Sequence, residues 1–544
     1  MRRPVIRSPR LVAGALLGAA ATTSGIALTA TSGWLIVRAS EQPVILTLLV
    51  AIVAVRTFGT ARPALRYAER LQSHDAALGD LAERRAQTYA RLVPLTPARL
   101  GRRRRSDLLG GVVDDLTDVV EAQVRVTVPV VTAALAGAVT AGIVAALNPT
   151  IGLVLAALLA AAAVLTVLAW GLELRSQPEL LAARAETTRV SQLVSARGLD
   201  LQAIGAQADA QRWLDDAHTE LERATRRQSR GRALASGGYL VLVGAATVVT
   251  AYLVWGMPDV PLPLKGLLVL TPVAVGEAFT PLIDAVRAAA RAQGASERLA
   301  DLLDQPPAVT DAPGVREATL PTGGVDLALT GVRATWTGER ADLGPIDLEI
   351  PAGTRLLVTG PNGGGKSTLL AVLARHLELS GGRYTVGGLD VRDLPLASVR
   401  ALVAVVDDEP FVLGSTLREN LRLARPDATD RDLAEGLVRA GLGSWVADLP
   451  DGLDTRLGAG ARGVSGGERT RLSIARAIVS GRPVILLDEP VAHLDHATAT
   501  AVLDDLLSGA TGRTVILVSH QPIEPERFDR VVEVAGAGMQ SGAR

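Results

Sequence analysis

Residues 360–368 read Gly-Pro-Asn-Gly-Gly-Gly-Lys-Ser-Thr, and this stretch decides the fold of the second half of the chain. An apolar run, 355–358, precedes it, and a segment of helical character, 369–376, follows it. The pattern is G-x-x-x-x-G-K-[ST] in a strand–loop–helix setting. In such a loop the glycines let backbone N–H groups face phosphate oxygens, and the helix N-terminus adds a favourable dipole. The stretch therefore predicts a nucleotide-binding domain.

The nucleotide is expected to be a triphosphate that binds with Mg²⁺. Lys366 is expected to reach the β- and γ-phosphates, and Ser367 is expected to ligate Mg²⁺. Lys366 is one of only two lysines in the chain, the other being Lys265. The loop residues predicted to bind the nucleotide are Gly360, Asn362, Gly363, Gly365, Lys366, Ser367 and Thr368.

A second element of this site is the run Val-Ile-Leu-Leu-Asp-Glu-Pro at residues 484–490. Its four apolar residues predict a buried parallel strand. At the carboxyl end of that strand, Asp488 is expected to contact Mg²⁺ directly or through water, and Glu489 is placed to polarise the attacking water. The alternative, an ordinary strand end with two acidic residues, has little support beside an intact P-loop.

Between these elements, residues 464–469 read Val-Ser-Gly-Gly-Glu-Arg. This run resembles the LSGGQ signature of ABC ATPases, with Val in place of Leu and Glu in place of Gln. Ser465, Gly466 and Gly467 at a helix start would make a second phosphate cradle. In that family the ATP lies between the P-loop of one subunit and the signature of another, so the resemblance implies a dimer.

Further residues match the same family in order. Residues 493–495, His-Leu-Asp, resemble its D-loop, and His520 follows an apolar strand as the switch histidine expected at the γ-phosphate. Trp336 lies where the family places an aromatic ring on adenine, although simple packing is the alternative. Where the family carries a glutamine, this chain has Asp408. Its side chain is shorter than that of glutamine and is charged, and it is a candidate ligand of Mg²⁺. This departure puts in doubt how the site couples hydrolysis to the membrane domain.

The first half of the chain is apolar enough to predict membrane spans. Hydrophobic residues make up 48% of the sequence, and about 20 apolar residues cross the hydrocarbon core. We predict a retained N-terminal helix and not a cleaved signal peptide, because its apolar stretch is too long and lacks a clear cleavage site. The six predicted spans are Leu11–Val37, Pro43–Leu65, Val124–Leu147, Thr150–Leu172, Ser236–Trp255 and Leu262–Val286.

The spacing and charge of the connections predict the orientation. The connections 66–123 and 173–235 are long, rich in arginine and helical in pattern, whereas the other three are short and contain one arginine. The positive-inside rule places the N-terminus, both long connections and the ATPase domain in the cytoplasm. The predicted fold is a six-helix, ABC exporter-type transmembrane domain (1–303), a linker (304–321) and an α/β P-loop ABC nucleotide-binding domain (322–544).

Charged residues near the second span leave alternatives open. Arg62 and Arg66 are expected to extend to the cytoplasmic interface. Arg56 lies deeper and is a candidate for lining an anionic substrate path. Glu277 in the sixth span is either its partner or an interfacial residue.

Composition argues against nucleic acid binding and excludes sites that need cysteine. The formal net charge is zero, so there is no bulk argument for nucleic acid binding. The chain has no cysteine, which excludes disulfides and thiolate metal sites, and any thiol cargo must be held without a mixed disulfide.

Motifs in the membrane half resemble the CydC branch of the CydDC family of heterodimeric exporters. They are Ser32–Ile36, Val55–Gly59, Arg66–Arg70, Ser73–Ala76 and Tyr89–Pro97. The resemblance implies a CydD-type partner, the bacterial cytoplasmic membrane, and a role in cytochrome bd assembly. It also implies export of cysteine or glutathione, or of haem.

His74 is the candidate haem ligand, because the family's haem-ligating histidine lies in the same Ser-His-Asp-Ala motif and imidazole binds haem iron axially. The alternative is that His74 caps or bridges a helix beside Asp75.

Three other functions have weaker support in the sequence. A general drug or lipid exporter half would favour an aromatic-rich cavity, but only 3% of residues are aromatic. A haem-sensing regulatory subunit rests on Asp408 alone. A soluble DNA-associated ABC ATPase is incompatible with six spans.

Overall fold

The structure is a computed structural model of the 544-residue chain. It describes residues 9–96, 105–312, 324–338, 341–407, 410–458, 463–491, 496–520 and 523–534. The chain divides into two compact units. One comprises Met1–Arg91 with Arg103–Asp304, and the other comprises Leu92–Arg102 with Gln305–Arg544.

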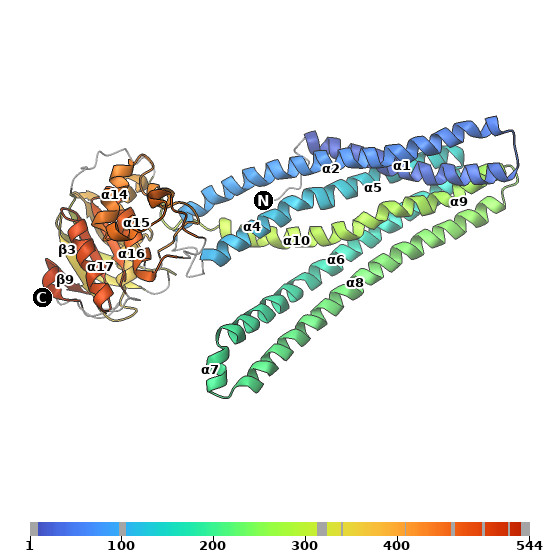
Figure 1. The fold of residues 1–544 in the computed structure, drawn as a ribbon. Helices are drawn as coiled ribbons and strands as arrows, with labels where there is room; N and C mark the ends of the chain where they lie inside the picture. The colour runs from blue at the N-terminus through green and yellow to red at the C-terminus, as the bar shows by residue number, and fades with distance from the viewer. Residues whose placement is uncertain are drawn as a thin grey trace. The chain divides into compact units, whose positions relative to one another are not determined.

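The first unit is entirely helical in its described part (Figure 1). Short non-α turns interrupt its helices at four places: η1 (Ile45–Leu48), η2 (Val93–Leu95, assigned to the second unit), the π-helical η3 (Gln123–Thr127) and η4 (Glu277–Phe279). Its helices are α1 (Pro9–Ser40), α2 (Leu49–Leu92), α4 (Arg105–Ala122), α5 (Val128–Leu147), α6 (Pro149–Ala196), α7 (Gly198–Ala203), α8 (Gln207–Trp255), α9 (Leu262–Gly276) and α10 (Thr280–Leu303).

Six of these helical stretches are long and apolar enough to cross a membrane, which confirms the predicted number of spans. The expected helical character of the long connections is also confirmed, because residues 180–196 belong to α6 and 213–227 to α8. The six stretches are Pro9–Ser40, Ile45–Leu95, Val112–Leu147, Pro149–Ala196, Gln207–Trp255 and Leu262–Leu303.

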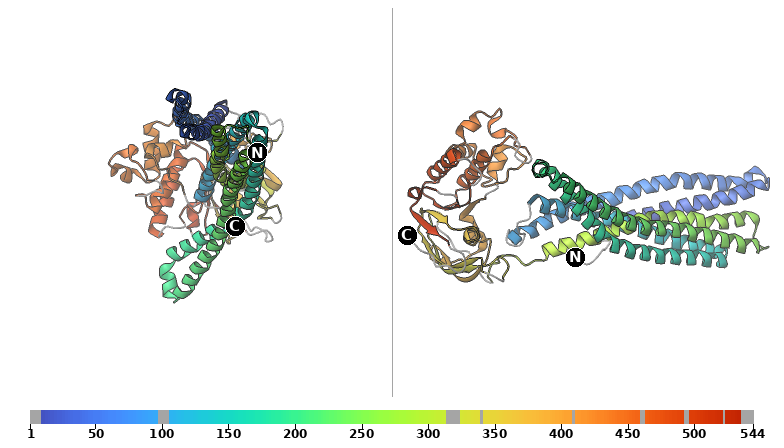
Figure 2. Two further views of the ribbon diagram at one scale, coloured as in Figure 1. Left: turned by 90° about the vertical axis from the view of Figure 1, so that its right-hand side faces the viewer. Right: turned by 90° about the horizontal axis from the view of Figure 1, so that it is seen from below.

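The short connection before α6 shows how sequence sets a helix start. Asn148 is extended and caps α6, its Oδ1 accepting a hydrogen bond from the backbone N–H of Ile151 at 3.2 Å. Pro149 takes the first helical position, where its missing N–H costs nothing. From this point α6 runs for 48 residues beside α8, and α7 joins the two at their far end (Figures 1 and 2).

Small residues let α1 and α9 approach closely. A Cβ on Gly33 would lie 2.9 Å from the carbonyl oxygen of Gly266, and a Cβ on Gly266 would lie 3.0 Å from the carbonyl oxygen of Gly33. Van der Waals packing across such small residues is one of the forces that associate helices in lipid.

One charge pairing differs from the pairing between Arg56 and Glu277 that the sequence raised. Arg62 Nη2 lies 2.9 Å from Glu277 Oε2, so Arg62, and not Arg56, is the partner of Glu277. The Arg62 side chain also packs against Gly25 of α1, where an added Cβ would lie 3.1 Å from its Nε. The expectation that Arg62 extends to the interface stays a prediction, and the structure adds the ion pair with Glu277. The pairing depends on how α2 and η4 pack, which no single segment encodes.

The second unit is an α/β domain with two sheets, and this confirms the predicted fold class. One sheet has the order β2-β1-β4-β5 with antiparallel pairs, and the other has the parallel order β6-β7-β8-β3-β9. The strands are β1 (Leu327–Ala334), β2 (Leu343–Ile350), β3 (Arg355–Thr359), β4 (Leu379–Val386), β5 (Leu389–Asp390), β6 (Val403–Val406), β7 (Val484–Asp488), β8 (Thr514–Val518) and β9 (Arg530–Glu533). The helices are α11 (Lys366–Leu373), α12 (Leu396–Ala401), α13 (Leu417–Arg422), α14 (Asp430–Arg439), α15 (Gly443–Ala447), α16 (Gly466–Val479) and α17 (His496–Gly509), with the 3₁₀ turns η5 (Gly452–Asp454) and η6 (Pro525–Arg527).

The parallel register determines where the chemistry lies. Asp488 at the end of β7 is level with Val518 at the end of β8, and Val518 is level with Val358 near the end of β3. Since these three strands are neighbours and point the same way, their carboxyl ends meet at one edge of the sheet. That edge carries the P-loop and the acidic strand end together.

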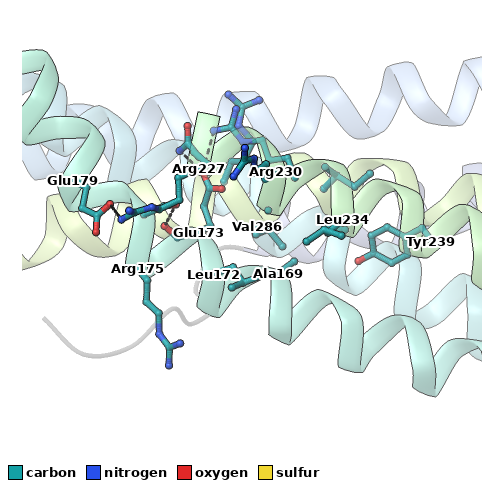
Figure 3. A pocket seen from close by; sticks show the side chains of 17 residues that line it. Ala169, Leu172, Glu173, Arg175, Glu179, Arg227, Arg230, Leu234, Tyr239 and Val286 are labelled. Carbon is teal, nitrogen blue, oxygen red and sulfur yellow. Dashed lines mark hydrogen bonds and ion pairs between the residues drawn. The ribbon is translucent and has the colours of Figure 1, made fainter. Parts of the chain in front are cut away.

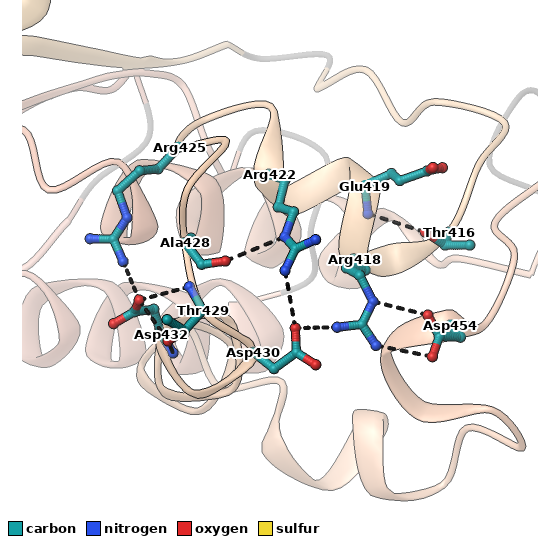
Figure 4. Close-up of polar contacts among 10 residues, drawn as sticks. All are labelled: Thr416, Arg418, Glu419, Arg422, Arg425, Ala428, Thr429, Asp430, Asp432 and Asp454. Carbon is teal, nitrogen blue, oxygen red and sulfur yellow. Dashed lines mark hydrogen bonds and ion pairs between the residues drawn. The ribbon is translucent and has the colours of Figure 1, made fainter.

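An ion-pair network fixes the start of the helical region that follows β6 (Figure 4). Arg418 on α13 bonds both carboxylate oxygens of Asp454, each at 3.0 Å, and also pairs with Asp430 at the start of α14. These carboxylates hold the pKa of Arg418 well above its usual range. Thr429 caps α14 in a reciprocal capping box with Asp432. The network joins α13, α14 and η5.

The segment 92–96 belongs to the second unit, although it continues from α2. Leu95 is buried there, and Thr96 Oγ1 donates a hydrogen bond to the carbonyl oxygen of His376 at 2.8 Å. This segment lies in the Tyr89–Pro97 motif, and the contact gives that motif a structural role.

His376 makes this domain sensitive to acid. Burial, with repulsion from Arg400, lowers the pKa of His376 from 6.5 to about 4. Between these values the unfolded chain binds a proton that the folded domain does not, so stability falls as pH drops from 6.5 towards 4. At pH 5 the loss in the free energy of unfolding, relative to neutral pH, is about 2 kcal/mol.

We expect His376→Gln to narrow the difference in melting temperature between pH 7.5 and pH 5. The exposed His218→Gln is the control, and equal pH sensitivity in both variants would contradict this assignment.

Candidate nucleotide-binding site

The P-loop adopts a backbone that requires glycine at defined positions. Gly360, Gly363 and Gly365 have φ values of 140°, 77° and 96°, which L side chains rarely adopt. A Cβ on Gly360 would lie 2.2 Å from the carbonyl oxygen of Val534, and one on Gly365 would lie 2.7 Å from that of Asp342. Conformation and close backbone packing both therefore exclude larger residues at Gly360 and Gly365.

Lys366 is almost fully buried, at 6% exposure, and lies against the loop. Its Nζ donates to the carbonyl oxygens of Gly360 at 2.9 Å and Pro361 at 3.1 Å. An ammonium group has three N–H donors, so one remains to reach a phosphate oxygen.

Hard oxygen ligands meet beside Lys366. Ser367 Oγ donates to Asp488 Oδ1 at 3.3 Å, joining the start of α11 to the end of β7. Burial raises the pKa of the Asp488 carboxyl, and the neighbouring Glu489 and Asp407 charges raise it further. A hydroxyl and a carboxylate held together in this acidic, partly buried place fit the oxygen ligands that Mg²⁺ prefers. A cation bound there would offset the repulsion between these carboxylates.

Glu489 and His520 also come together. Glu489 Oε2 lies 2.8 Å from His520 Nδ1, and the backbone N–H of Glu489 donates to the carbonyl oxygen of Val518 at 3.1 Å. Glu489 has a φ of 49°, an uncommon conformation for a residue with a side chain. The backbone thus turns sharply after β7, and His520 Nδ1 is engaged by Glu489 while its Nε2 remains the nitrogen for another partner.

Trp336 lies next to the P-loop helix. Its Nε1 donates to Thr368 Oγ1 at 3.0 Å, and its ring is partly buried against the core under β1 and β2. The ring of Trp336 therefore packs against the core, as the alternative to adenine stacking holds. Part of the ring is still exposed, so adenine stacking stays a prediction.

The signature run starts a helix as expected. Ser465 is the N-cap of α16 and forms a capping box with Glu468, whose Oε2 accepts from the Ser465 N–H at 2.6 Å. Ser465 and Gly466 are exposed, whereas Gly467 is buried. The Glu that replaces the family's Gln thus has a local structural role, and Ser465 remains accessible to a ligand.

Arg476 on α16 is a positioning residue, and the sequence analysis predicts no role for it. It bonds the carbonyl oxygens of Asn420 and Phe411 and, at 2.6 Å, Asn420 Oδ1. Burial lowers the pKa of Arg476. The sign of such a role in the sequence is that Arg476 is a charged residue within the otherwise apolar run 474–477. The side chain links the signature helix to α13 and to the loop between β6 and α13.

Two groups of predicted residues lie outside the described residues, namely Asp408 and 493–495. His74 lies elsewhere, exposed on α2 in the membrane unit. Its neighbour Asp75 pairs with Arg10 at 2.5 Å, whereas His74 itself makes no hydrogen bond within the described part of the chain. Among the described residues, no group of three or more His, Cys, Asp or Glu side chains is placed to hold a metal ion.

Comparison with known proteins agrees with this geometry. A family model described as ABC transporter matches residues 343–492. The chain is 32% identical to the glutathione/L-cysteine transport system ATP-binding/permease protein CydC of Escherichia coli, over 95% of this chain and 91% of that protein. It is 29% identical to CydD of the corresponding system of Bacillus subtilis, over 95% and 90%. A structure of a bacterial Atm1-family ABC exporter with ATP bound is similar in fold, with a TM-score of 0.79 and 20% identity over 98% and 96% of the two chains.

Proposed function

This chain belongs to the ABC transporter family as a membrane-spanning transport ATPase of the CydC type, and on that premise we propose that it is one half of a heterodimeric exporter. Its partner would be a CydD-type subunit in the bacterial cytoplasmic membrane. The cargo would be a thiol reductant such as cysteine or glutathione, or haem, in support of cytochrome bd assembly. The observation that carries this proposal is the likeness to CydC along almost the whole chain.

The need for a partner follows from the motif count. The sequence contains one P-loop and one signature, and in this family each ATP is bound between the P-loop of one subunit and the signature of the other. Ser465 and Gly466 are exposed at the start of α16, as a site for a nucleotide held by another subunit requires.

We infer the residue roles in hydrolysis from the contacts at the sheet edge. Backbone N–H groups of residues 360–368 and Lys366 would hold the phosphates, and Ser367 with Asp488 would hold Mg²⁺, which neutralises charge on the phosphates. Glu489 would accept a proton from water, held in place by its contact with His520. Thr368 orients Trp336 for the adenine.

Support for haem as cargo comes from the surroundings of His74. Tyr67, Leu71 and Leu78 are 71%, 59% and 66% exposed, and with His74 they follow the spacing of one helix face. Arg70, one turn before His74, is also exposed. An exposed apolar stripe around an imidazole, with a cation nearby, suits a flat apolar ring that carries carboxylates.

Haem binding gives the test of this cargo. We expect haem to stimulate ATP hydrolysis by the purified heterodimer and to develop a Soret band, and His74→Ala to weaken haem binding by about tenfold or more and to abolish the stimulation. The matched control is His218→Ala, because His218 is exposed on α8. If glutathione stimulates the enzyme while haem changes neither readout, the cargo is a thiol and the haem assignment is wrong.

A further inference from the structure

A cavity of about 430 Å³ lies within the membrane unit between α6, α8 and α10 (Figure 3). It is separate from the nucleotide site and from the face of α2 that carries His74. Its lining comes from the middle of α6, the middle of α8 and the start of α10. Charged side chains gather at one end, around Arg227 and Glu179, and Tyr239 lies at the other.

The polarity of the lining changes along the helices. Following α8 from Arg227 to Tyr239, the lining passes from charged to apolar over twelve residues, which is about 18 Å of helix. On α6, Ala169 and Leu172 line the apolar end and Glu179 lies at the charged end. A ligand that matches this lining has a polar head and an apolar body.

The charged end is cationic. Five lining residues are arginines and two are glutamates. Arg227 pairs with Glu179 at 2.5 Å, and Arg232 pairs with the buried Glu173 at 3.1 Å, so both glutamates already have partners. Arg175 and Arg230 make no hydrogen bond or ion pair with any described residue.

Two further N–H groups support an anionic ligand. Arg232 Nε and Arg287 Nε are buried and have no hydrogen-bond partner among the described residues. Leaving a charged donor without a partner is costly, and the loss is greater for a charged group than for a neutral one. An acceptor-rich group in the cavity would satisfy such donors.

The depth of the cavity indicates where its ligand comes from. The apolar end at Ala169 lies 20 residues, or about 30 Å, along α6 from Pro149, which is the thickness of the hydrocarbon core. The cationic end therefore lies at the interface on the arginine-rich side, which is cytoplasmic by the positive-inside rule. Basic pockets between spanning helices at this depth suit anionic lipid headgroups.

We propose that this cavity binds an anionic phospholipid of the cytoplasmic leaflet. Its phosphate lies at the cationic end, which Arg175, Arg230 and Arg232 help to line, and the first part of an acyl chain lies against Leu172, Leu234 and Tyr239. The bound lipid joins α6, α8 and α10 where α6 and α8 leave the membrane. A soluble anion would satisfy the arginines equally well but would leave the apolar end uncovered, which favours the lipid.

The test is lipid binding by the full chain, purified with its partner subunit in neutral detergent. Phosphatidylglycerol in mixed micelles is titrated, binding is read from the melting temperature, and phosphatidylcholine is the neutral comparison. We expect phosphatidylglycerol to stabilise the wild type more than phosphatidylcholine does. The double variant Arg175→Gln/Arg230→Gln should bind phosphatidylglycerol about 25-fold more weakly, since each arginine near the headgroups contributes roughly fivefold.

Both substituted arginines are exposed and unpaired within the described residues, so their replacement leaves the fold intact. Arg226→Gln is the matched control, because Arg226 lies on α8 outside the cavity lining and pairs with Glu222 at 2.5 Å. Equal binding by the double variant and the control would overturn the proposal. Stabilisation of the wild type by inorganic phosphate or glycerol phosphate as strong as that by phosphatidylglycerol would overturn it in favour of a soluble anion.

Discussion

Replacing Glu489 by Gln is expected to lower the rate of ATP hydrolysis at this subunit's P-loop by about 10²- to 10⁴-fold while leaving ATP binding intact. The amide keeps the size of the side chain and a hydrogen bond to His520, but it cannot accept a proton from the attacking water. Steady-state release of phosphate by the purified heterodimer measures the rate, and binding of a fluorescent ATP analogue measures the affinity.

The position of Glu489 explains why so large an effect is expected. It follows β7 directly, its φ of 49° turns the chain sharply, and His520 Nδ1 holds its carboxylate at 2.8 Å. A base held on rigid strand ends loses little freedom when the water arrives. Since Asp488 precedes it and engages Ser367, the two acids have different partners, and we expect them to have different roles.

The control is Glu526→Gln, because Glu526 is an exposed glutamate on η6 in the same domain. This variant should turn over ATP at the wild-type rate. Turnover of Glu489→Gln within twofold of the wild type would contradict the assignment, and hydrolysis would then belong to the composite site built on the partner's P-loop.

Much of the nucleotide site is predictable from sequence because each part lies in a short motif at the end of a strand. Lys366, Asp488 and His520 are far apart in the chain, yet each follows an apolar run that reads as a buried strand. Parallel strands bring their carboxyl ends to one edge, so the sequence predicts that these side chains share an edge. The strand order β7-β8-β3, which makes them direct neighbours, comes only from the structure.

Contacts between distant helices are not predictable in the same way. The sequence raises Arg56 as a partner of Glu277, whereas the structure pairs Glu277 with Arg62, and the choice depends on the rotation of α2 against η4. The cavity between α6, α8 and α10 is likewise hidden in the sequence, where its arginines read as positive charge of a cytoplasmic loop. Hydrophobic periodicity gives the length and type of a helix, but it does not say which helix packs against which.

A contact with a distant segment also constrains the P-loop glycines, although the loop is a single motif. The second prediction with a large expected effect concerns Gly360. Gly360→Ala is expected to destabilise the nucleotide-binding domain by about 3 kcal/mol and to abolish ATP binding. A left-handed backbone costs a residue with a Cβ roughly 1–2 kcal/mol, and forcing a carbon to 2.2 Å from the Val534 carbonyl oxygen adds about 1–3 kcal/mol. The melting temperature of the domain should fall by about 6–12 °C.

Gly363→Ala is the matched variant, because Gly363 belongs to the same loop and also has a positive φ, of 77°, but a Cβ there would meet no atom within 4 Å. Only the backbone cost applies, so its melting temperature should fall by about half as much. Equal falls in melting temperature for the two variants would show that φ alone decides the effect and that the contact with Val534 contributes nothing to it. A larger loss for Gly360→Ala would show that the chain after β9 helps to hold the P-loop, a constraint that lies about 170 residues away in sequence.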